Sequence, residues 1–362
     1  MSIFESILIT VITASTPLLL ASIGELVTER SGVLNLGVEG MMVMGAIVAF
    51  AITQATGSPY VGAVAGALAG VLMSLLFGFL TLTLVANQVA TGLALTILGL
   101  GLSGLVGEPY VGMQGIKLPQ FLPNWLADIP WIGRVLLGQD LIFYISIALV
   151  FGTHWFLFRT RAGLTVRSIG DNHSSAHALG INVIGVRYLT VMYGGACAGL
   201  AGAHLSLVYT PQWVENMTAG RGWIALALVV FASWRPYRLL VGGYLFGAVS
   251  IMQLHAQAGG WVVPAFLLPM LAALLVVWLA LEILRYFYKR LDNRLVWGVL
   301  ALTVIAVFFA YRGDAAYPPP AQFLSALPYL ATVVVLIIIS QNRRLTLINT
   351  PASLGKPFVP DR

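Results

Sequence analysis

The stretch "VGAVAGALAGVLMSLLFGFLTLTLV", residues 61–85, contains no charged side chain over 25 positions. Coiled as an α-helix it would be about 37 Å long, more than the roughly 30 Å of a bilayer's hydrocarbon core. It is too long for a strand of a membrane β-barrel, which needs about ten residues of alternating polarity. This stretch therefore predicts a transmembrane helix.

Similar apolar runs recur along all 362 residues. Hydrophobic residues make up 59% of the chain, charged residues 9%, and the mean hydropathy is +0.91, which is outside the range of soluble domains. The first run has no basic segment before it, so we interpret it as a retained span rather than a cleaved signal peptide. We predict an all-α integral membrane protein whose single transmembrane domain, residues 1–362, is a polytopic bundle of about eleven helices.

The eleven predicted spans are long enough to cross a bilayer, except the seventh, which would have to be tilted or broken. They cover residues 6–23, 34–54, 61–85, 89–106, 141–158, 185–208, 222–234, 239–256, 264–283, 295–311 and 325–340. Alternation along these spans places fifteen Lys and Arg side chains on one side and four on the other. Because basic loops stay in the cytoplasm, the N-terminus is predicted outside and the C-terminus inside.

The net charge of +6 follows from this bias and gives no reason to predict nucleic-acid binding; membrane lipid is the expected surrounding. Small residues at helical spacing are predicted to let helix backbones approach closely. They are Gly62, Gly66 and Gly70 in one span and Gly195, Gly199 and Gly202 in another.

One polar segment on the predicted cytoplasmic side, "RSIGDNHSSAHALGIN" (167–182), is typical of a short helix marked at both ends. Asp171 or Asn172 could cap its N-terminus, and Gly180 stands where a left-handed C-terminal cap is wanted. The segment could be a surface loop or a docking element for a partner. A metal site at His173 and His177, one turn apart, is disfavoured because no third ligand is evident.

Three further stretches resemble a known family. They are "GELVTERSGVLNLGVEGMMVMGA" (24–46), "MTAGRGWIALALVVFASWRPYRLLVGGYLFG" (217–247), and "LPYLATVVVLIIIS" with "PASLGKPF" (327–340, 351–358). With segment 167–182 they resemble ABC importer permeases of the ribose and branched-chain amino acid class, most of all nucleoside ABC transporter permease subunits. In such importers a second permease subunit, here expected to be a sister chain, completes the pathway. ABC ATPase subunits drive it and an extracytoplasmic binding protein delivers the substrate.

The resemblance implies a multi-pass protein of the bacterial inner membrane. Its core would be residues 1–256, followed by an inserted helix pair at about 260–318 and a last helix with a cytoplasmic tail at 319–362. No phosphate-binding G-x-x-x-x-G-K-[ST] motif occurs, so a transport subunit is expected rather than an enzyme, with ATP hydrolysed on a separate chain. No cofactor is predicted.

The resemblance also makes residues 171–180 a coupling helix that sits in a cleft of the ATPase. The residues expected to couple to the ATPase are Asp171, Asn172, Ala176, His177, Leu179 and Gly180. We expect the change Ala176→Arg to block docking while leaving thermal stability nearly unchanged.

Intramembrane polar side chains suggest a substrate pathway. The candidates are Asn35, Glu39, Asn87, Gln88 and Thr91. Glu39 could instead pair with Arg30 or extend to the membrane surface. These groups supply little fixed charge and suit a neutral solute: a nucleoside first, then a ribose-like sugar, then a purine base.

Two other classes of function remain open. An intramembrane serine protease would need the motif "GLSG" (101–104) together with His204 or His255. An ion-coupled secondary transporter would need acids or broken helices near the midplane, and acids are scarce in the sequence.

Overall fold

The structure is a computed structural model that describes residues 3–127, 129, 133–258, 263–264, 277, 316–317, 330 and 349–359. Two compact units divide the chain: Met1–Ile251 with Tyr329–Arg362, and Met252–Pro328. In the second unit, Val263–Pro264 (β1) pairs antiparallel with Ala316–Tyr317 (β2). The candidate site described below belongs to the first unit.

The first unit is helical. Its long elements are α1 (Ile3–Arg30), α2 (Val38–Thr56), α3 (Pro59–Gly78), α4 (Gln88–Gly107), α6 (Leu141–Arg159), α9 (Val183–His204) and α11 (Pro236–Ala258, which ends in the second unit). Its short elements are η1 (Phe79–Thr83), η2 (Glu108–Tyr110), α5 (Asn124–Ala127), η3 (Gly133–Leu137), α7 (Arg161–Asp171), α8 (His173–Ala178), η4 (Leu205–Tyr209) and α10 (Arg221–Phe231).

Seven helices in the described part of the chain are long and apolar enough to cross a membrane. They are Glu5–Arg30, Val38–Thr56, Pro59–Thr83, Gln88–Tyr110, Leu141–Arg159, Val183–Tyr209 and Pro236–Leu254. The prediction of an integral membrane protein built from helices is confirmed. The predicted spans 264–283, 295–311 and 325–340, and with them the inserted helix pair, lie outside the described residues except for a few isolated positions.

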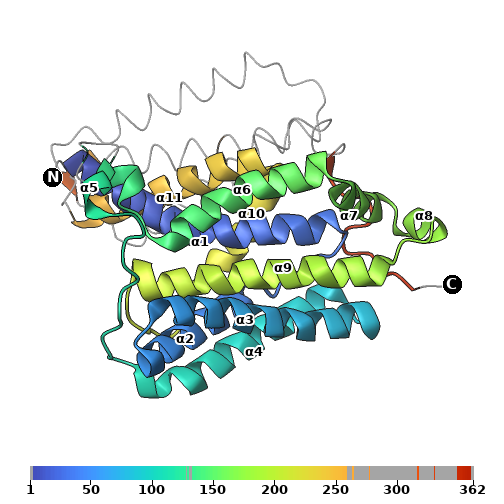
Figure 1. Cartoon of the computed structure of the whole chain (residues 1–362), viewed down its shortest axis with the longest axis horizontal. Coiled ribbons are helices and arrows are strands. Elements are labelled where there is room, and N and C mark those ends of the chain that lie inside the picture. Colours follow the sequence, from blue (N-terminus) through green and yellow to red (C-terminus); the bar gives the residue numbers. More distant parts are fainter. Residues whose placement is uncertain are drawn as a thin grey trace, which may run out of the picture. The chain divides into compact units, whose positions relative to one another are not determined.

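The centre of the first unit is a close packing of α9 against α2 and α3, which lie below it in Figure 1, with α1 and α6 above. Glycines make this approach possible. A Cβ atom added at Gly70 would collide with the carbonyl oxygen of Gly195, and one added at Gly199 would collide with that of Gly66. The predicted packing role of these small residues is confirmed.

The seventh predicted span is a half-length helix. α10 has eleven residues, and its N-terminus lies against Glu39 near the start of α2. Just beyond its C-terminal end, Trp234 donates from Nε1 to Glu29 at 2.6 Å, and its carbonyl accepts from Arg30 Nη2 at 3.0 Å. Residues 210–220, which precede α10, are not helical, so the helix in this part of the chain is shorter than the seventh predicted span.

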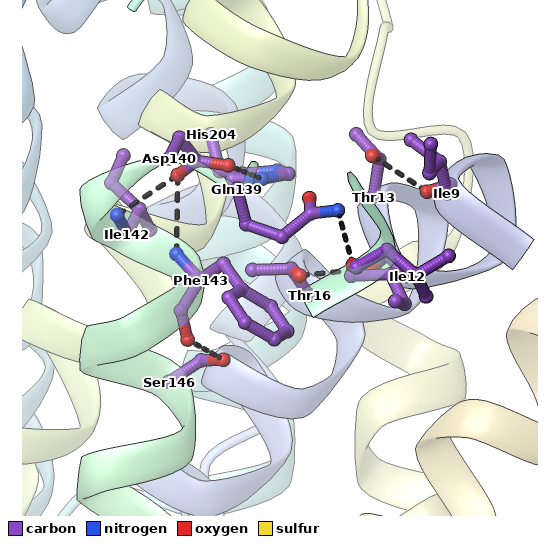
Figure 2. A network of polar contacts seen from close by, with 11 residues as sticks. Ile9, Ile12, Thr13, Thr16, Gln139, Asp140, Ile142, Phe143, Ser146 and His204 are labelled. Atoms are coloured by element: carbon purple, nitrogen blue, oxygen red, sulfur yellow. Dashed lines mark hydrogen bonds and ion pairs between the residues drawn. The ribbon is translucent and has the colours of Figure 1, made fainter. Parts of the chain in front are cut away.

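At the end of α9 remote from α8, a buried polar network joins two helices (Figure 2). Asp140 caps α6 by accepting from the backbone amides of Ile142 and Phe143, at 2.8 and 3.1 Å. Its other oxygen lies 3.5 Å from Nε2 of His204 at the end of α9. Burial raises the pKa of the Asp140 carboxyl, but the facing His204 ring and the hydrogen bonds of the two amides outweigh burial and hold the pKa below its usual value.

Candidate functional site

The segment between α6 and α9 folds into two short helices whose starts are each capped by a side chain. Thr160 Oγ1 accepts from the amide of Gly163 at 3.0 Å and begins α7. Asn172 Oδ1 accepts from the amide of Ser175, also at 3.0 Å, and begins α8. Asp171 ends α7 instead of capping α8, so of the two predicted caps Asn172 is the one used. Side-chain caps of this kind are each worth about 1 kcal/mol.

α8 ends at the predicted glycine. Gly180 has φ +82°, a left-handed conformation that favours glycine, and its amide donates to the His177 carbonyl at 2.8 Å. Just before it, the side chain of Leu179 is 82% exposed, at the end of the bundle where α7 and α8 project (Figure 1). Leu179 is therefore an apolar side chain left uncovered beside the C-terminal cap of α8.

Ala176 does not lie on this projecting surface. It is 3% exposed and packs in a small apolar cluster with Ile169 and Val183, which Phe358 covers. The expectation that Ala176→Arg would leave stability unchanged is therefore wrong, because the arginine would have to enter this cluster. The helix surface predicted to meet a partner consists of the exposed residues around Ala176 rather than Ala176 itself.

The C-terminal tail, residues 349–359, packs against α8 (Figure 1, red). Phe358 lies between two histidine rings of α8, with centroids 5.2 Å from His173 and 5.4 Å from His177. Burial, together with the charges of Arg187 and Lys356, lowers the pKa of His173 below its usual value. Groups of three or more metal-binding side chains do not occur among the described residues.

Two of the five predicted pathway residues meet at the linker between α1 and α2 (residues 31–37). Gln88 Oε1 accepts from the amide of Leu34 at 2.8 Å, and Asn35 Oδ1 accepts from that of Gly37 at 2.9 Å. The amide of Asn35 donates to Glu25 Oε1 at 3.1 Å. Both Asn35 and Gln88 are buried, so the linker is held by side chains rather than by water.

Glu39 has a different set of partners. Its carboxylate is 3% exposed and accepts from Thr218 Oγ1 at 2.5 Å and from the amides of Gly220 and Gly222 at 2.9 and 2.6 Å. These donors surround the start of α10, so the acid caps a helix whose dipole is positive at that end. The alternative pairing of Glu39 with Arg30 is not formed; Arg30 binds the Trp234 carbonyl.

The remaining two pathway candidates lie at the start of α4. Asn87 is exposed and caps the helix, its Oδ1 accepting from the amide of Ala90 at 3.0 Å, while Thr91 is half-buried. The structure thus gathers Asn35, Gln88, Asn87 and Thr91 near one linker and one helix start, and holds Glu39 at the start of α10.

Sequence reasoning missed a pair of buried acids, Glu25 and Glu29, one turn apart on α1. Glu25 Oε2 and the amide nitrogen of the Gln88 side chain are buried without a hydrogen-bond partner in the described structure. The sequence does contain a signal for this pair, because the two acids of "GELVTER" are four residues apart. Acids inside an apolar span are costly and mark functional sites.

Comparison with known proteins identifies the family. Residues 7–279 match the family described as branched-chain amino acid transport system, permease component. The chain belongs to this family.

Individual relatives agree with that result. A putative glucose ABC transporter permease of Haloferax volcanii is 43% identical, covering 71% of this chain and 80% of the relative. A guanosine ABC transporter permease of Bacillus subtilis is 32% identical over 64% of this chain and 77% of its own. A nucleoside ABC transporter permease of Lactococcus lactis is 30% identical over 68% and 80%. No solved structure matches.

As a permease, the protein is a multi-pass membrane component of a transport system rather than an enzyme. Two of the residues that a serine protease would need have other partners in the structure. The Ser103 hydroxyl donates to the Leu100 carbonyl at 2.9 Å, and His204 faces Asp140. His255 lies at a position whose side chain the structure does not describe.

Proposed function

We propose that this permease is the transmembrane subunit of an ATP-driven importer that carries nucleosides into a bacterial cell across its inner membrane. The observation that carries the proposal is the projecting α8 with its exposed Leu179, in a chain without a phosphate-binding motif of its own. A transport subunit of this kind needs a surface through which a separate ATPase drives it.

The docking surface would be formed by the exposed side of the α8 segment. Its residues are Asp171, Asn172, His177, Leu179 and Gly180, with Ala176 packed behind them. Leu179 would enter an apolar pocket of the ATPase, and the polar residues around it would form the rim. The segments on either side of α8 carry four arginines, Arg159, Arg161, Arg167 and Arg187. Basic residues are typical of cytoplasmic loops, which favours the cytoplasmic side for this segment.

The pathway would pass the linker between α1 and α2. Amide and hydroxyl groups of Asn35, Asn87, Gln88 and Thr91 offer both hydrogen-bond donors and acceptors, which suit the hydroxyls of a ribose and the edge of a heterocyclic base. Glu39 would act at the same place by fixing the start of α10. A second permease, which we take to be a sister chain, would complete the pathway, and an extracytoplasmic binding protein would deliver the substrate.

The proposed topology has eleven spans, with the N-terminus outside and the C-terminus inside. It rests on fifteen basic side chains against four on the two sides. A cysteine introduced at Asn293 should resist an impermeant thiol reagent in intact cells. Rapid labelling there would refute the topology.

A simple sugar is the second candidate substrate, because a relative that is 43% identical bears the name of a putative glucose permease. The nucleoside assignment is supported by two relatives named for guanosine and nucleosides, and by the tail motif "PASLGKPF".

Uptake in cells separates the two substrates. The permease is expressed with its partner subunits, and uptake of radiolabelled guanosine is measured in the presence of a hundredfold excess of unlabelled nucleoside or glucose. We expect uridine or adenosine to compete and glucose not to compete. Absence of guanosine uptake, together with uptake of labelled glucose that excess nucleoside does not lower, would assign the permease to sugars.

A further inference from the structure

Arg187 is a buried charged residue near the start of α9. Its side chain is 1% exposed, and none of the described carboxylates forms an ion pair with it. Buried charges need compensation, and here it comes from the backbone and from a histidine. The guanidinium donates from Nε to the Ser31 carbonyl at 3.1 Å and from Nη1 to the Lys356 carbonyl at 3.5 Å. Nη2 lies 3.3 Å from Nδ1 of His173.

These three contacts join four segments that are far apart in the sequence: the end of α1, the start of α8, α9 itself and the C-terminal tail. The tail makes two further backbone contacts at the same place. The amide of Ser353 donates to the Gly170 carbonyl at 2.8 Å, and that of Gly355 donates to the Gly32 carbonyl at 3.1 Å. The tail is therefore attached both to the α7–α8 segment and to the linker between α1 and α2.

The chemistry of this junction makes it stiff. A guanidinium is planar and presents its N–H groups in fixed directions, so the segments it binds keep a fixed relative position. The Ser31 carbonyl lies beside the C-terminus of α1, the negative end of that helix dipole, which stabilises the positive charge. Because the group is buried, a broken contact is not replaced by water, and separation of any one segment is costly.

We propose that Arg187 and the tail form a mechanical link that carries the displacement of α8 to the linker between α1 and α2. Arg187 is a positioning residue: it touches neither nucleotide nor substrate, but connects the surface that meets the ATPase to the linker that holds Asn35 and Gln88. This inference rests on the proposed function, because it assumes that an ATPase moves α8.

The test is the coupling ratio, the amount of substrate transported per ATP hydrolysed, in the reconstituted full transporter. Arg187→Met keeps an unbranched apolar chain in place of the arginine stem and removes the guanidinium. Arg238→Met is the matched control, because Arg238 is an exposed arginine near the start of α11 whose loss removes the same charge. We expect Arg187→Met to assemble with the ATPase and to hydrolyse ATP at the basal rate, while transport per ATP falls about threefold to thirtyfold.

A second variant disturbs the tail without removing any charge. Gly355 has φ +72°, so Gly355→Val strains the tail at its contact with Gly32. We expect the same loss of coupling as in Arg187→Met. A normal coupling ratio in both variants would overturn the inference, as would a loss of transport and ATP hydrolysis in equal proportion, which marks a merely structural role. If the unaltered transporter shows no ATP-driven uptake at all, the proposed function fails instead.

Discussion

Replacing Glu39 by alanine should destabilise the permease strongly. The change removes the only described acceptor of three donors at the start of α10: the buried Thr218 hydroxyl, the buried amide of Gly222 and the half-buried amide of Gly220. A buried donor left without a partner costs about 1–3 kcal/mol. Because the hydroxyl can rotate to another acceptor while the two amides cannot, the expected loss in the free energy of unfolding is about 2–6 kcal/mol.

The assay is thermal inactivation of the purified permease in detergent, followed as the fraction that remains monodisperse after heating. Glu215→Ala is the control, since this acid is exposed on the loop just before α10. The thermal stability of Glu39→Gln should lie between that of the wild type and that of Glu39→Ala. The amide oxygen of the glutamine still accepts a hydrogen bond, but its NH2 group would face the other donors. The half-life at a fixed temperature is the quantity to compare, because membrane proteins commonly unfold irreversibly.

Equal half-lives for Glu39→Ala and Glu215→Ala would refute the reasoning, since α10 would then not need its acidic cap. If Glu39 also contacts substrate, Glu39→Gln should lower uptake by more than its loss of stability explains. Full uptake in Glu39→Gln at normal expression would assign Glu39 to helix capping alone.

Two further predictions concern α8. Leu179→Asp should lower co-purification of the ATPase at least tenfold without lowering thermal stability, whereas Ala176→Arg should lower both; intact co-purification of Leu179→Asp would contradict the docking surface. The pKa of His173 is lower in the folded protein than in the unfolded chain, where it is about 6.5. The neutral ring therefore stabilises the fold fully above pH 6.5, and this contribution is lost as the pH falls below 6.5 toward the folded pKa. The wild type should therefore lose more thermal stability between pH 7.5 and 5.5 than His173→Gln, and equal losses would exclude this role.

Much of the fold follows from local sequence. Length and hydropathy predict the long helices, because an apolar run of twenty residues has few alternatives in a bilayer. Gly180 is predictable as a left-handed cap for the same local reason. Whether Asp171 or Asn172 caps α8 was not predictable, because the cap is the residue at which the helical backbone is interrupted. That residue is Asn172, whose backbone is extended.

The features that sequence reasoning missed depend on contacts between distant residues. Ala176 is buried because Phe358, about 180 positions later, covers it. The partners of Glu39 are similarly remote, at residues 218–222, and only the fold brings them to the start of α2. The function of Arg187 is hidden for the same reason, since a basic residue near a helix start is usually a sign of the cytoplasmic side and nothing more.

The most direct test of the central claim is uptake by proteoliposomes that contain the permease, its sister chain and the ATPase, with the binding protein outside and ATP enclosed. The account predicts accumulation of labelled guanosine that requires hydrolysable ATP and is lost in Leu179→Asp at unchanged permease content. Accumulation that persists without ATP and follows an ion gradient would contradict the account and assign the protein to the secondary transporters.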